Sequence, residues 1–397
     1  MTYHVLMLLV CYALPVVTAL GQAGFAKAGF SQSNSNSTSN DKNLDKIFTI
    51  DASYLYGTIL QHNPDISHLI TDHPTAILLS YNRKTYGGQE WQSRYNFPDY
   101  GFSFAYQDMK NRFLGEAYGA YAHYNFYFFN RNMQFRVGQG ISYMTRPFDV
   151  DSNPQNNAYG TRLTSSTYLL GNYRKENLFH GFGFQVGASI IHYSNANVRA
   201  PNNSTNTWLF NAGVNYTFNH EEIPEYKIWP KRKYTEPIGL TAVARLGFNE
   251  SDYRGSGQYP FYDFSVYLDK RINIKSSLHA GLELFIAEFL KEYRDYRVNS
   301  FPEDDIDGDE NFQRAGIFVG HELHLGKTSL LSQLGYYYYQ PIPFESRFYN
   351  RLGLQRRLTD NIFASVTVKA HGAKAEGVSL GIGYRFENIF KSKLEKL

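Results

Sequence analysis

The chain has 397 residues and a formal net charge of +3, and 43% of its residues are hydrophobic, 17% aromatic and 19% charged. This composition is too apolar and too aromatic for a disordered chain, and the small net charge with scattered basic residues argues against nucleic acid as a partner. No stretch of about 18 apolar residues follows the N-terminal segment, so membrane-spanning helices are excluded.

The first segment, residues 1–23, is typical of a secretory signal peptide. An apolar run from Val5 to Leu20 is followed by small residues that suit cleavage. The single cysteine, Cys11, lies in this run, so the exported chain would have no thiol for a disulfide or a metal. Residues 24–45 are rich in Ser and Asn, and we expect a flexible lead-in there.

The rest of the chain alternates apolar and polar residues with period two. The even positions of one such stretch are apolar (Phe182, Phe184, Val186, Ala188 and Ile190), and the odd positions between them are small or polar. Alternation of this kind, with aromatic residues at the strand ends, is typical of strands that face lipid on one side and a lumen on the other. We predict an all-β, antiparallel transmembrane β-barrel of about 14–16 strands. The strands divide into a first set in 46–218 and a second set in 238–386, with a connector at 219–237 and a tail at 387–397.

The connections between the predicted strands differ in length on the two sides of the membrane. With a periplasmic N-terminus, the short connections fall on the periplasmic side (129–132, 176–180, 272–275 and 358–361), and the longer ones fall outside (146–163, 195–206 and 291–312). Two long segments, 84–98 and 219–237, break this rule and could be plugs, periplasmic helices or miscounted strands. A large soluble β-sandwich is the alternative, which period two alone does not exclude.

One predicted strand ends in His192 and Ser194, which share the apolar, lipid-facing side of Ile190. Polar side chains on that face are costly unless they lie at the membrane interface or have a function. A histidine beside a serine can deprotonate its hydroxyl. Alone, this His-x-Ser pattern is weak, and an interfacial histidine with an ordinary serine is the simpler interpretation.

The surrounding residues are more specific. The run His192-Tyr193-Ser194-Asn195-Ala196, followed by Pro201-Asn202, resembles the lipid A 3-O-deacylase family of outer-membrane barrels, whose catalytic centre has a His-x-Ser-Asn run and a Pro-Asn turn. The similarity is specific over 180–218 and weaker at 95–108 and 114–128, where longer members, often called acyloxyacyl hydrolases, are also similar. The family core is an eight-stranded barrel, so the resemblance does not cover 238–386.

The resemblance implies a role for each matching residue. Ser194 matches the nucleophile, His192 the general base, and Asn195 the residue that helps to bind the oxyanion. The acid that orients the histidine aligns with Asn206, which can hold the histidine tautomer but cannot stabilise its positive charge. On a regular strand Asn195 would face the lumen, so its role requires a twist at the strand end. Asn206 lies on the lipid-facing side, where it can contact His192 across the strand pair.

Other charged residues are weaker candidates. Glu376 heads another even stripe, and in a single barrel the last strand pairs with the first, far from His192, so we interpret Glu376 as interfacial. Lys369 and His371 would face the lumen beside it. The acidic run at 303–310 matches only a fragment of a calcium-binding loop, so a solvated loop is the expectation and divalent bridging to lipid phosphates the minor alternative.

The main hypothesis is therefore an outer-membrane esterase that cleaves an ester-linked acyl chain of lipopolysaccharide, with no cofactor and no metal. The alternative is a non-catalytic barrel, a channel or structural protein, that keeps the deacylase scaffold. The partners we expect are lipid A and the outer membrane, and the sequence leaves open whether the chain forms a homodimer.

Overall fold

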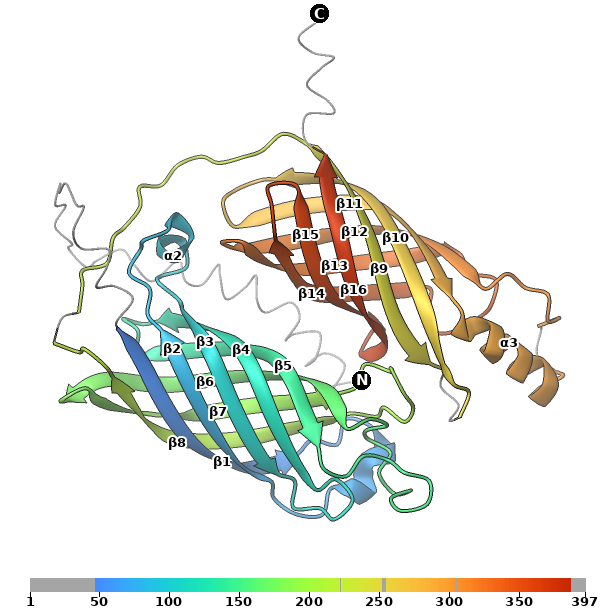
Figure 1. Cartoon of the computed structure of the whole chain (residues 1–397), viewed down its shortest axis with the longest axis horizontal. Helices are drawn as coiled ribbons and strands as arrows, with labels where there is room; N and C mark the ends of the chain where they lie inside the picture. Colours follow the sequence, from blue (N-terminus) through green and yellow to red (C-terminus); the bar gives the residue numbers. More distant parts are fainter. Residues whose placement is uncertain (1–46, 222, 252–254, 304–305, 387–397) are drawn as a thin grey trace, which may run out of the picture. The chain divides into compact units, whose positions relative to one another are not determined.

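The computed structural model of the protein describes residues 47–221, 223–251, 255–303 and 306–386. The predicted signal peptide (1–23), lead-in (24–45) and tail (387–397) lie outside these residues. Within them, sixteen strands close into two antiparallel barrels of eight strands each (Figure 1). The predicted all-β, antiparallel barrel fold is confirmed, and closure without edge strands excludes a β-sandwich.

Barrel 1 is formed by the first eight strands. They are β1 (Phe48–Ile59), β2 (Thr75–Arg83), β3 (Asp99–Asp108), β4 (Glu116–Phe128), β5 (Met133–Met144), β6 (Leu163–Phe179), β7 (Phe182–Ser194) and β8 (Thr205–Thr217). Neighbours along the chain pair with each other, and β1 closes the ring by pairing with β8. With 13 residues, β7 exceeds the roughly 9–11 that a tilted strand needs to cross a bilayer.

Barrel 2 is formed by the other eight strands. They are β9 (Gly239–Glu250), β10 (Gln258–Arg271), β11 (Ser276–Ala287), β12 (Gln313–Leu325), β13 (Thr328–Tyr339), β14 (Phe348–Arg357), β15 (Ile362–His371) and β16 (Lys374–Phe386). Here β16 closes the ring by pairing with β9. A single ring of sixteen would instead pair the last strand with the first, so that part of the sequence interpretation was wrong.

Each barrel has one end with long connections, which we call the loop end, and one with short connections, the turn end. Three of the predicted short turns, 129–132, 272–275 and 358–361, coincide with the gaps between strands. The fourth is shorter than predicted, because β6 continues to Phe179 and the chain turns at His180 and Gly181, both with positive φ. In barrel 1 the loop end contains the 3₁₀ helix η2 (Pro64–Leu69), which Asn63 caps by accepting from the Asp65 N–H.

The two segments that broke the length rule are explained by a helix and a packed connector. The 84–98 segment contains helix α2 (Glu90–Arg94) at the turn end of barrel 1. The start of the connector lies against it, since Lys227 N–H donates to Tyr86 O (2.8 Å) and the Trp229 indole donates to Gly87 O (2.8 Å). Helix α3 (Phe289–Ser300) lies in the connection between β11 and β12. None of the helices in the described part of the chain is long and apolar enough to cross a membrane.

The strands have the two faces that their alternation predicts. In β7 the side chains of Phe184 and Val186 are 42% and 48% exposed on the outside, whereas Gln185 and Ser189 are 2% and 3% exposed inside. Large exposed apolar residues recur in this way on the other strands of both barrels. The outer walls are therefore apolar bands, as a transmembrane barrel requires.

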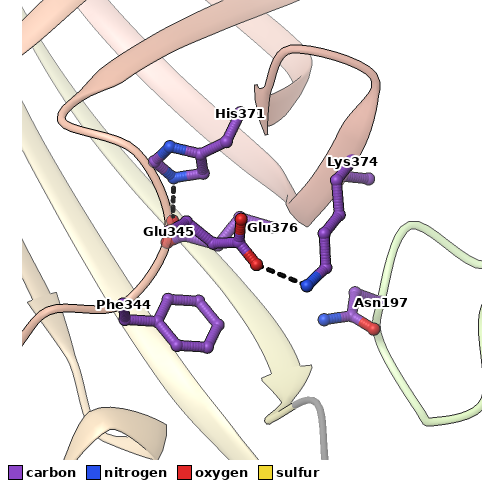
Figure 2. Close-up of a pocket in the computed structure, with 7 residues that line it drawn as sticks. Asn197, Phe344, Glu345, His371, Lys374 and Glu376 are labelled. Carbon is purple, nitrogen blue, oxygen red and sulfur yellow. Dashed lines mark hydrogen bonds and ion pairs between the residues drawn. The ribbon is translucent and has the colours of Figure 1, made fainter.

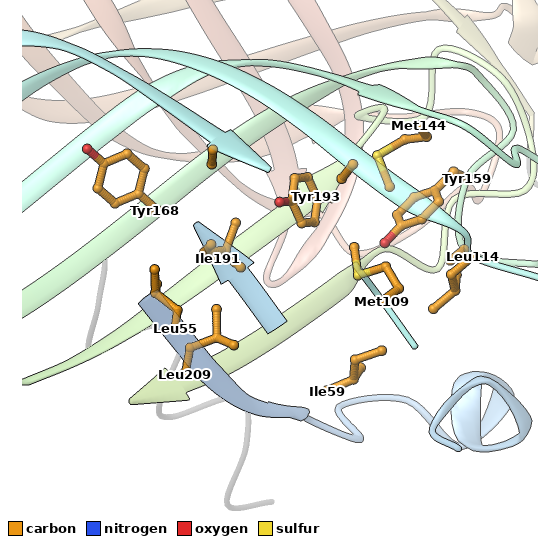
Figure 3. Packing of buried hydrophobic residues seen from close by; sticks show 14 of the residues in the cluster. Leu55, Ile59, Met109, Leu114, Met144, Tyr159, Tyr168, Ile191, Tyr193 and Leu209 are labelled. Atoms are coloured by element: carbon orange, nitrogen blue, oxygen red, sulfur yellow. The ribbon is translucent and has the colours of Figure 1, made fainter. Parts of the chain in front are cut away.

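The lumen of barrel 1 is filled by side chains in two layers. Towards the loop end, aliphatic and aromatic residues pack together, among them Leu55, Tyr168, Ile191, Tyr193 and Leu209 (Figure 3). Towards the turn end, the buried Asp51 carboxylate accepts hydrogen bonds from Arg136 Nη2 (2.8 Å) and Asn82 Nδ2 (2.7 Å), and Arg174 Nη1 lies 3.3 Å away. The interior is thus a packed core rather than a water-filled channel.

Candidate functional site

The candidate pair lies in the last residues of β7, at the loop end of barrel 1. His192 and Ser194 continue the even stripe of Phe184 and Val186, so both are on the outer wall. Ser194 is nevertheless only 7% exposed, and His192 is half-buried. The pair is therefore placed where lipid chains border the barrel, yet is partly shielded from them.

His192 is oriented by the neighbouring strand. His192 and Asn206 are register partners in the β7–β8 pair, and His192 Nδ1 lies 2.8 Å from Asn206 Oδ1. The contact that the sequence predicted across the strand pair is present. Because Asn206 Oδ1 is an acceptor, this bond places the proton on Nδ1 and leaves Nε2 as the basic nitrogen.

Ser194 and Asn195 both bind a third residue, Asn202. The Ser194 hydroxyl donates to Asn202 Oδ1 (3.1 Å), and the Asn195 backbone N–H donates to the same oxygen (2.9 Å). The chain turns immediately afterwards, since β7 ends at Ser194 and Ala196 has a φ of 52°. Asn195 therefore lies just beyond the end of the regular strand.

The loop that carries Asn202 is held by the connection between β1 and β2. His62 Nε2 lies 3.0 Å from the Asn203 carbonyl oxygen and 3.3 Å from Ser204 Oγ. The Asn63 side-chain amide donates to Asn203 Oδ1 (3.3 Å). These contacts fix the position of the loop relative to the end of β7.

The outer wall next to the pair carries further polar side chains. In the β6–β7 register, Thr167 is opposite His192 and Ser165 is opposite Ser194. Gln139 on β5 joins them, since it donates to Ser165 Oγ (3.1 Å) and accepts from Thr167 Oγ1 (2.5 Å). We call Gln139, Ser165 and Thr167 the outer polar strip. Such a strip is unfavourable against hydrocarbon, so it indicates an interfacial or functional surface.

Glu376 is not on the outer wall, and its prediction as an interfacial residue was wrong. The β15–β16 register shifts here, because Lys369 pairs with Gly377 and Ala370 pairs with Ala375, which leaves Glu376 without a partner. This bulge turns Glu376 into the lumen, where its Oε2 lies 2.7 Å from His371 Nε2 (Figure 2).

The same lumen cluster of barrel 2 holds two further cations. Lys369 Nζ lies 2.6 Å from Glu376 Oε1, and Arg314 Nη1 donates to Oε2 (3.0 Å). Lys369 and His371 are buried on the lumen face, as the sequence predicted. The carboxylate of Glu376 is thus neutralised inside its own barrel.

The acidic run is only partly described, since residues 304–305 lie outside the described ranges. Among the described residues, Asp307, Asp309 and Glu310 have carboxylate oxygens within 4.8 Å of one another. Burial alone would raise the pKa of Glu310, but the backbone N–H groups of Asp307 and Gly308 outweigh it and hold that pKa below its ordinary value. This carboxylate therefore already has hydrogen-bond donors within its loop.

The sequence interpretation missed Asn202 and the outer polar strip as parts of the site. Asn202 had a signal, because the Pro-Asn turn belongs to the motif, but its contact with Ser194 depends on the loop conformation. The strip lies on strands far from the motif along the chain. Only strand pairing brings Thr167 and Ser165 beside His192 and Ser194.

Two family models match the chain, one for each barrel. The family model described as lipid A 3-O-deacylase (PagL) matches residues 75–215, and the one described as acyloxyacyl hydrolase, C-terminal domain, matches residues 238–388. The two matches correspond to barrel 1 without β1 and to barrel 2. No curated protein matches the chain significantly.

Solved structures give only slight likeness. A chain titled "De novo design of transmembrane beta-barrels" has 13% identity and a TM-score of 0.24, and the match covers 39% of this chain and all of that one (100%). A mutant of the Rh. blastica porin has 10% identity and a TM-score of 0.18, and the match covers 86% of this chain and 99% of that one. Likeness of this size does not bear on the function.

Proposed function

Since the chain belongs to the lipid A 3-O-deacylase and acyloxyacyl hydrolase family, we propose that it is an outer-membrane esterase that removes an ester-linked acyl chain from lipid A. In this proposal Ser194 is the nucleophile, His192 the general base and Asn206 the residue that orients His192. The observation that carries it is the 2.8 Å contact between His192 Nδ1 and Asn206 Oδ1, on the same outer face as Ser194.

The reaction begins with a change of hydrogen-bond partner. The Ser194 hydroxyl has one hydrogen, which it donates to Asn202 Oδ1 in the free protein, so it must turn to His192 Nε2 before attack. Asn202 Oδ1 also occupies the Asn195 N–H. We infer that the substrate carbonyl oxygen replaces the Asn202 oxygen at this N–H, which then stabilises the oxyanion.

The acyl transfer then needs only protein groups and water. Ser194 Oγ attacks the acyl carbonyl carbon while Nε2 of His192 takes the hydroxyl proton. The C–O bond to the sugar breaks, and His192 returns its proton to the leaving sugar oxygen. A water molecule then attacks the acyl-Ser194 ester, gives its proton to His192, and releases the fatty acid with the Ser194 hydroxyl restored.

The substrate fits an outward-facing site. The acyl chains of lipid A run alongside the apolar band of the barrel, and their ester groups lie at the membrane interface, level with the end of β7 in an orientation with the loop end outside. The outer polar strip would contact the sugar and phosphate groups of the same lipid. This geometry delivers an ester carbonyl to Ser194 without an internal channel, consistent with the packed lumen of barrel 1.

The decisive experiment measures lipid A by mass spectrometry after incubation with the purified protein in detergent. The wild type should shorten lipid A by one acyl group, and Ser194→Ala and His192→Ala should each abolish this. Ser189→Ala is the matched control, because Ser189 is on the same strand but faces the lumen. If the wild type leaves lipid A unchanged, the non-catalytic barrel is the better conclusion, and if either site variant keeps most of the activity, the site is assigned wrongly.

A further inference from the structure

The outer polar strip beside Ser194 contains no charged side chain. Gln139, Ser165 and Thr167 can exchange hydrogen bonds with a sugar or a phosphate, but they cannot neutralise a phosphate. Neutralising a phosphate on the bound lipid therefore requires a cation from another position at the loop end of barrel 1.

Arg162 immediately precedes β6 and lies at the rim of the outer wall. Its guanidinium Nη1 donates to the hydroxyl of Tyr143 (3.2 Å) and to the Thr145 carbonyl oxygen (3.1 Å). Tyr143 belongs to the outer face of β5, where it is 43% exposed, and it is the register partner of Leu163 on β6. Two hydrogen bonds from one nitrogen thus hold the guanidinium against the outer wall.

The opposite edge of this guanidinium is open. Arg162 is exposed, and no residue in the described part of the chain accepts a hydrogen bond from its Nε or Nη2. These two nitrogens lie along one side of the planar group, and that side can bind two phosphate oxygens at once. Arg162 is therefore an oriented cation whose bidentate edge is unused.

Three other cations lie on the β3–β4 and β5–β6 connections, and none of them is held against the outer wall. Lys110 Nζ is paired with a carboxylate oxygen of β3 (2.6 Å). The guanidinium of Arg112 lies over a phenylalanine ring, 4.6 Å from its centroid. Arg146 is exposed, and no described residue is hydrogen-bonded to its guanidinium. Among these cations, Arg162 has the orientation that a specific site requires.

The distance from Arg162 to the candidate catalytic pair suits one sugar ring. Three residues, about 10 Å of strand, separate Arg162 from Ser165 on β6, and Ser165 is the register partner of Ser194. Between them the exposed side chains of Leu163 and Tyr143 form a surface on which a sugar ring can lie. A lipid whose ester group is at Ser194 can thus place a phosphate of the same sugar at Arg162.

We propose that Arg162 is the phosphate-binding residue of this site, and that the protein selects acyl esters of a phosphorylated sugar over the same esters without phosphate. This inference rests on the proposed function and names the part of the headgroup that the site recognises. Nε and Nη2 of Arg162 donate to two phosphate oxygens, while the Tyr143 hydroxyl and the Thr145 carbonyl keep the guanidinium in place. Tyr143 is a positioning residue, because it acts through Arg162.

The first test measures binding, which does not depend on catalysis. The Ser194→Ala protein in detergent is titrated calorimetrically with two lipids. One is diacylglucosamine 1-phosphate, with one amide-linked and one ester-linked acyl chain, and the other is the same lipid without phosphate. The phosphorylated lipid should bind more tightly. Adding Arg162→Gln should raise its Kd by about 10- to 100-fold, the effect of losing hydrogen bonds to a charged group, and should leave the Kd of the phosphate-free lipid within about twofold.

Arg112→Gln is the matched control. It removes the same charge from the loop end, at a side chain that lies over Phe113 rather than against Tyr143. It should change either Kd by no more than about twofold, because solvent and salt screen a charge that does not touch the lipid. Equal losses for Arg112→Gln and Arg162→Gln would overturn the proposal, since the phosphate would then respond only to the overall charge of the loop end. Equal Kd values for the two lipids would overturn it as well.

The second test separates this inference from the proposed function. With Ser194 in place, fatty-acid release from the two lipids is measured, and heat-modifiable migration confirms that each variant is folded. Arg162→Gln, and to a smaller extent Tyr143→Phe, should raise KM for the phosphorylated lipid and leave its kcat and the hydrolysis of the phosphate-free lipid within about twofold.

The two inferences fail in different ways. Binding that depends on Arg162 without any release of fatty acid would support the phosphate site and refute the esterase. Release of fatty acid from both lipids at the same KM, unaffected by Arg162→Gln, would support the esterase and refute the phosphate site.

Discussion

Asn206 offers the sharpest test of how the site on barrel 1 is organised. Its side-chain oxygen accepts one hydrogen bond from His192 Nδ1 at 2.8 Å. A hydrogen bond between neutral groups contributes about 0.5–1.5 kcal/mol. With a factor of ten for each 1.4 kcal/mol or so, Asn206→Ala should lower kcat/KM for deacylation by about 2- to 12-fold. Loss of the general base, by comparison, costs about 100- to 10,000-fold.

A carboxylate at the same position should change the rate in the other direction. Hydrogen bonds to charged groups contribute about 1.5–3 kcal/mol, and a carboxylate also stabilises the imidazolium that forms when His192 takes the Ser194 proton. Asn206→Asp keeps the length of the side chain, so its oxygen reaches Nδ1 from the same place. Asn206→Glu carries the same charge but is one methylene longer. Both variants should hold kcat/KM or raise it by up to roughly tenfold.

The assay is the rate of fatty-acid release from lipid A in detergent, with heat-modifiable migration on a gel as the check that each barrel is folded. Two results would refute the reasoning. A loss for Asn206→Ala as large as that for Ser194→Ala would mean that Asn206 does more than orient the ring. A large loss for both acidic variants would mean that another acid already serves His192.

The remaining predictions concern stability and are measured by urea unfolding in lipid vesicles. Ala188→Arg should destabilise barrel 1 by about 2–4 kcal/mol if Ala188 lies near the bilayer midplane, whereas Ala188→Leu on the same lipid face should not, and equal effects would contradict the outward assignment. Asp51→Ala leaves buried guanidinium groups without their carboxylate and should lower the free energy of unfolding by about 3–5 kcal/mol. As its control, Asp151→Ala in an exposed loop should change that free energy by less than about 0.5 kcal/mol. Glu376→Ala should destabilise barrel 2 by a similar 3–5 kcal/mol but leave lipid A deacylation intact, and loss of deacylation in the folded variant would contradict the separation of the two barrels.

The strand pattern was predictable because lipid and lumen impose opposite requirements on alternate residues. That constraint located the turns at 129–132, 272–275 and 358–361, and it placed His192, Ser194 and Asn206 on one face. Ring closure was not predictable in the same way. Period two says which face a residue takes but not which strand is the neighbour of β8, so sixteen strands in one ring or in two have the same alternation.

Local irregularities in the strands also limited what could be predicted from the sequence. The bulge opposite Lys369 turns Glu376 from the lipid face to the lumen, and a single unpaired residue of this kind leaves no mark in the alternation. The lumen was equally hard to predict. Period two assigns Ser189 to the lumen face but does not tell whether that lumen is open or packed. Ser189 is 3% exposed in a packed interior, so an Arg at this position would meet steric resistance.

The closure of each barrel on itself has a consequence for truncated and rearranged genes. Each strand of β1–β8 pairs on both sides with strands that precede the connector. Each strand of β9–β16 pairs on both sides with strands that follow it. A protein that ended within 219–237 would therefore expose no unpaired strand edge, and neither would a fragment that started there. Loss, duplication or replacement of one ring leaves the backbone hydrogen bonding of the other complete, so the two halves are free to be inherited and to diverge as separate modules.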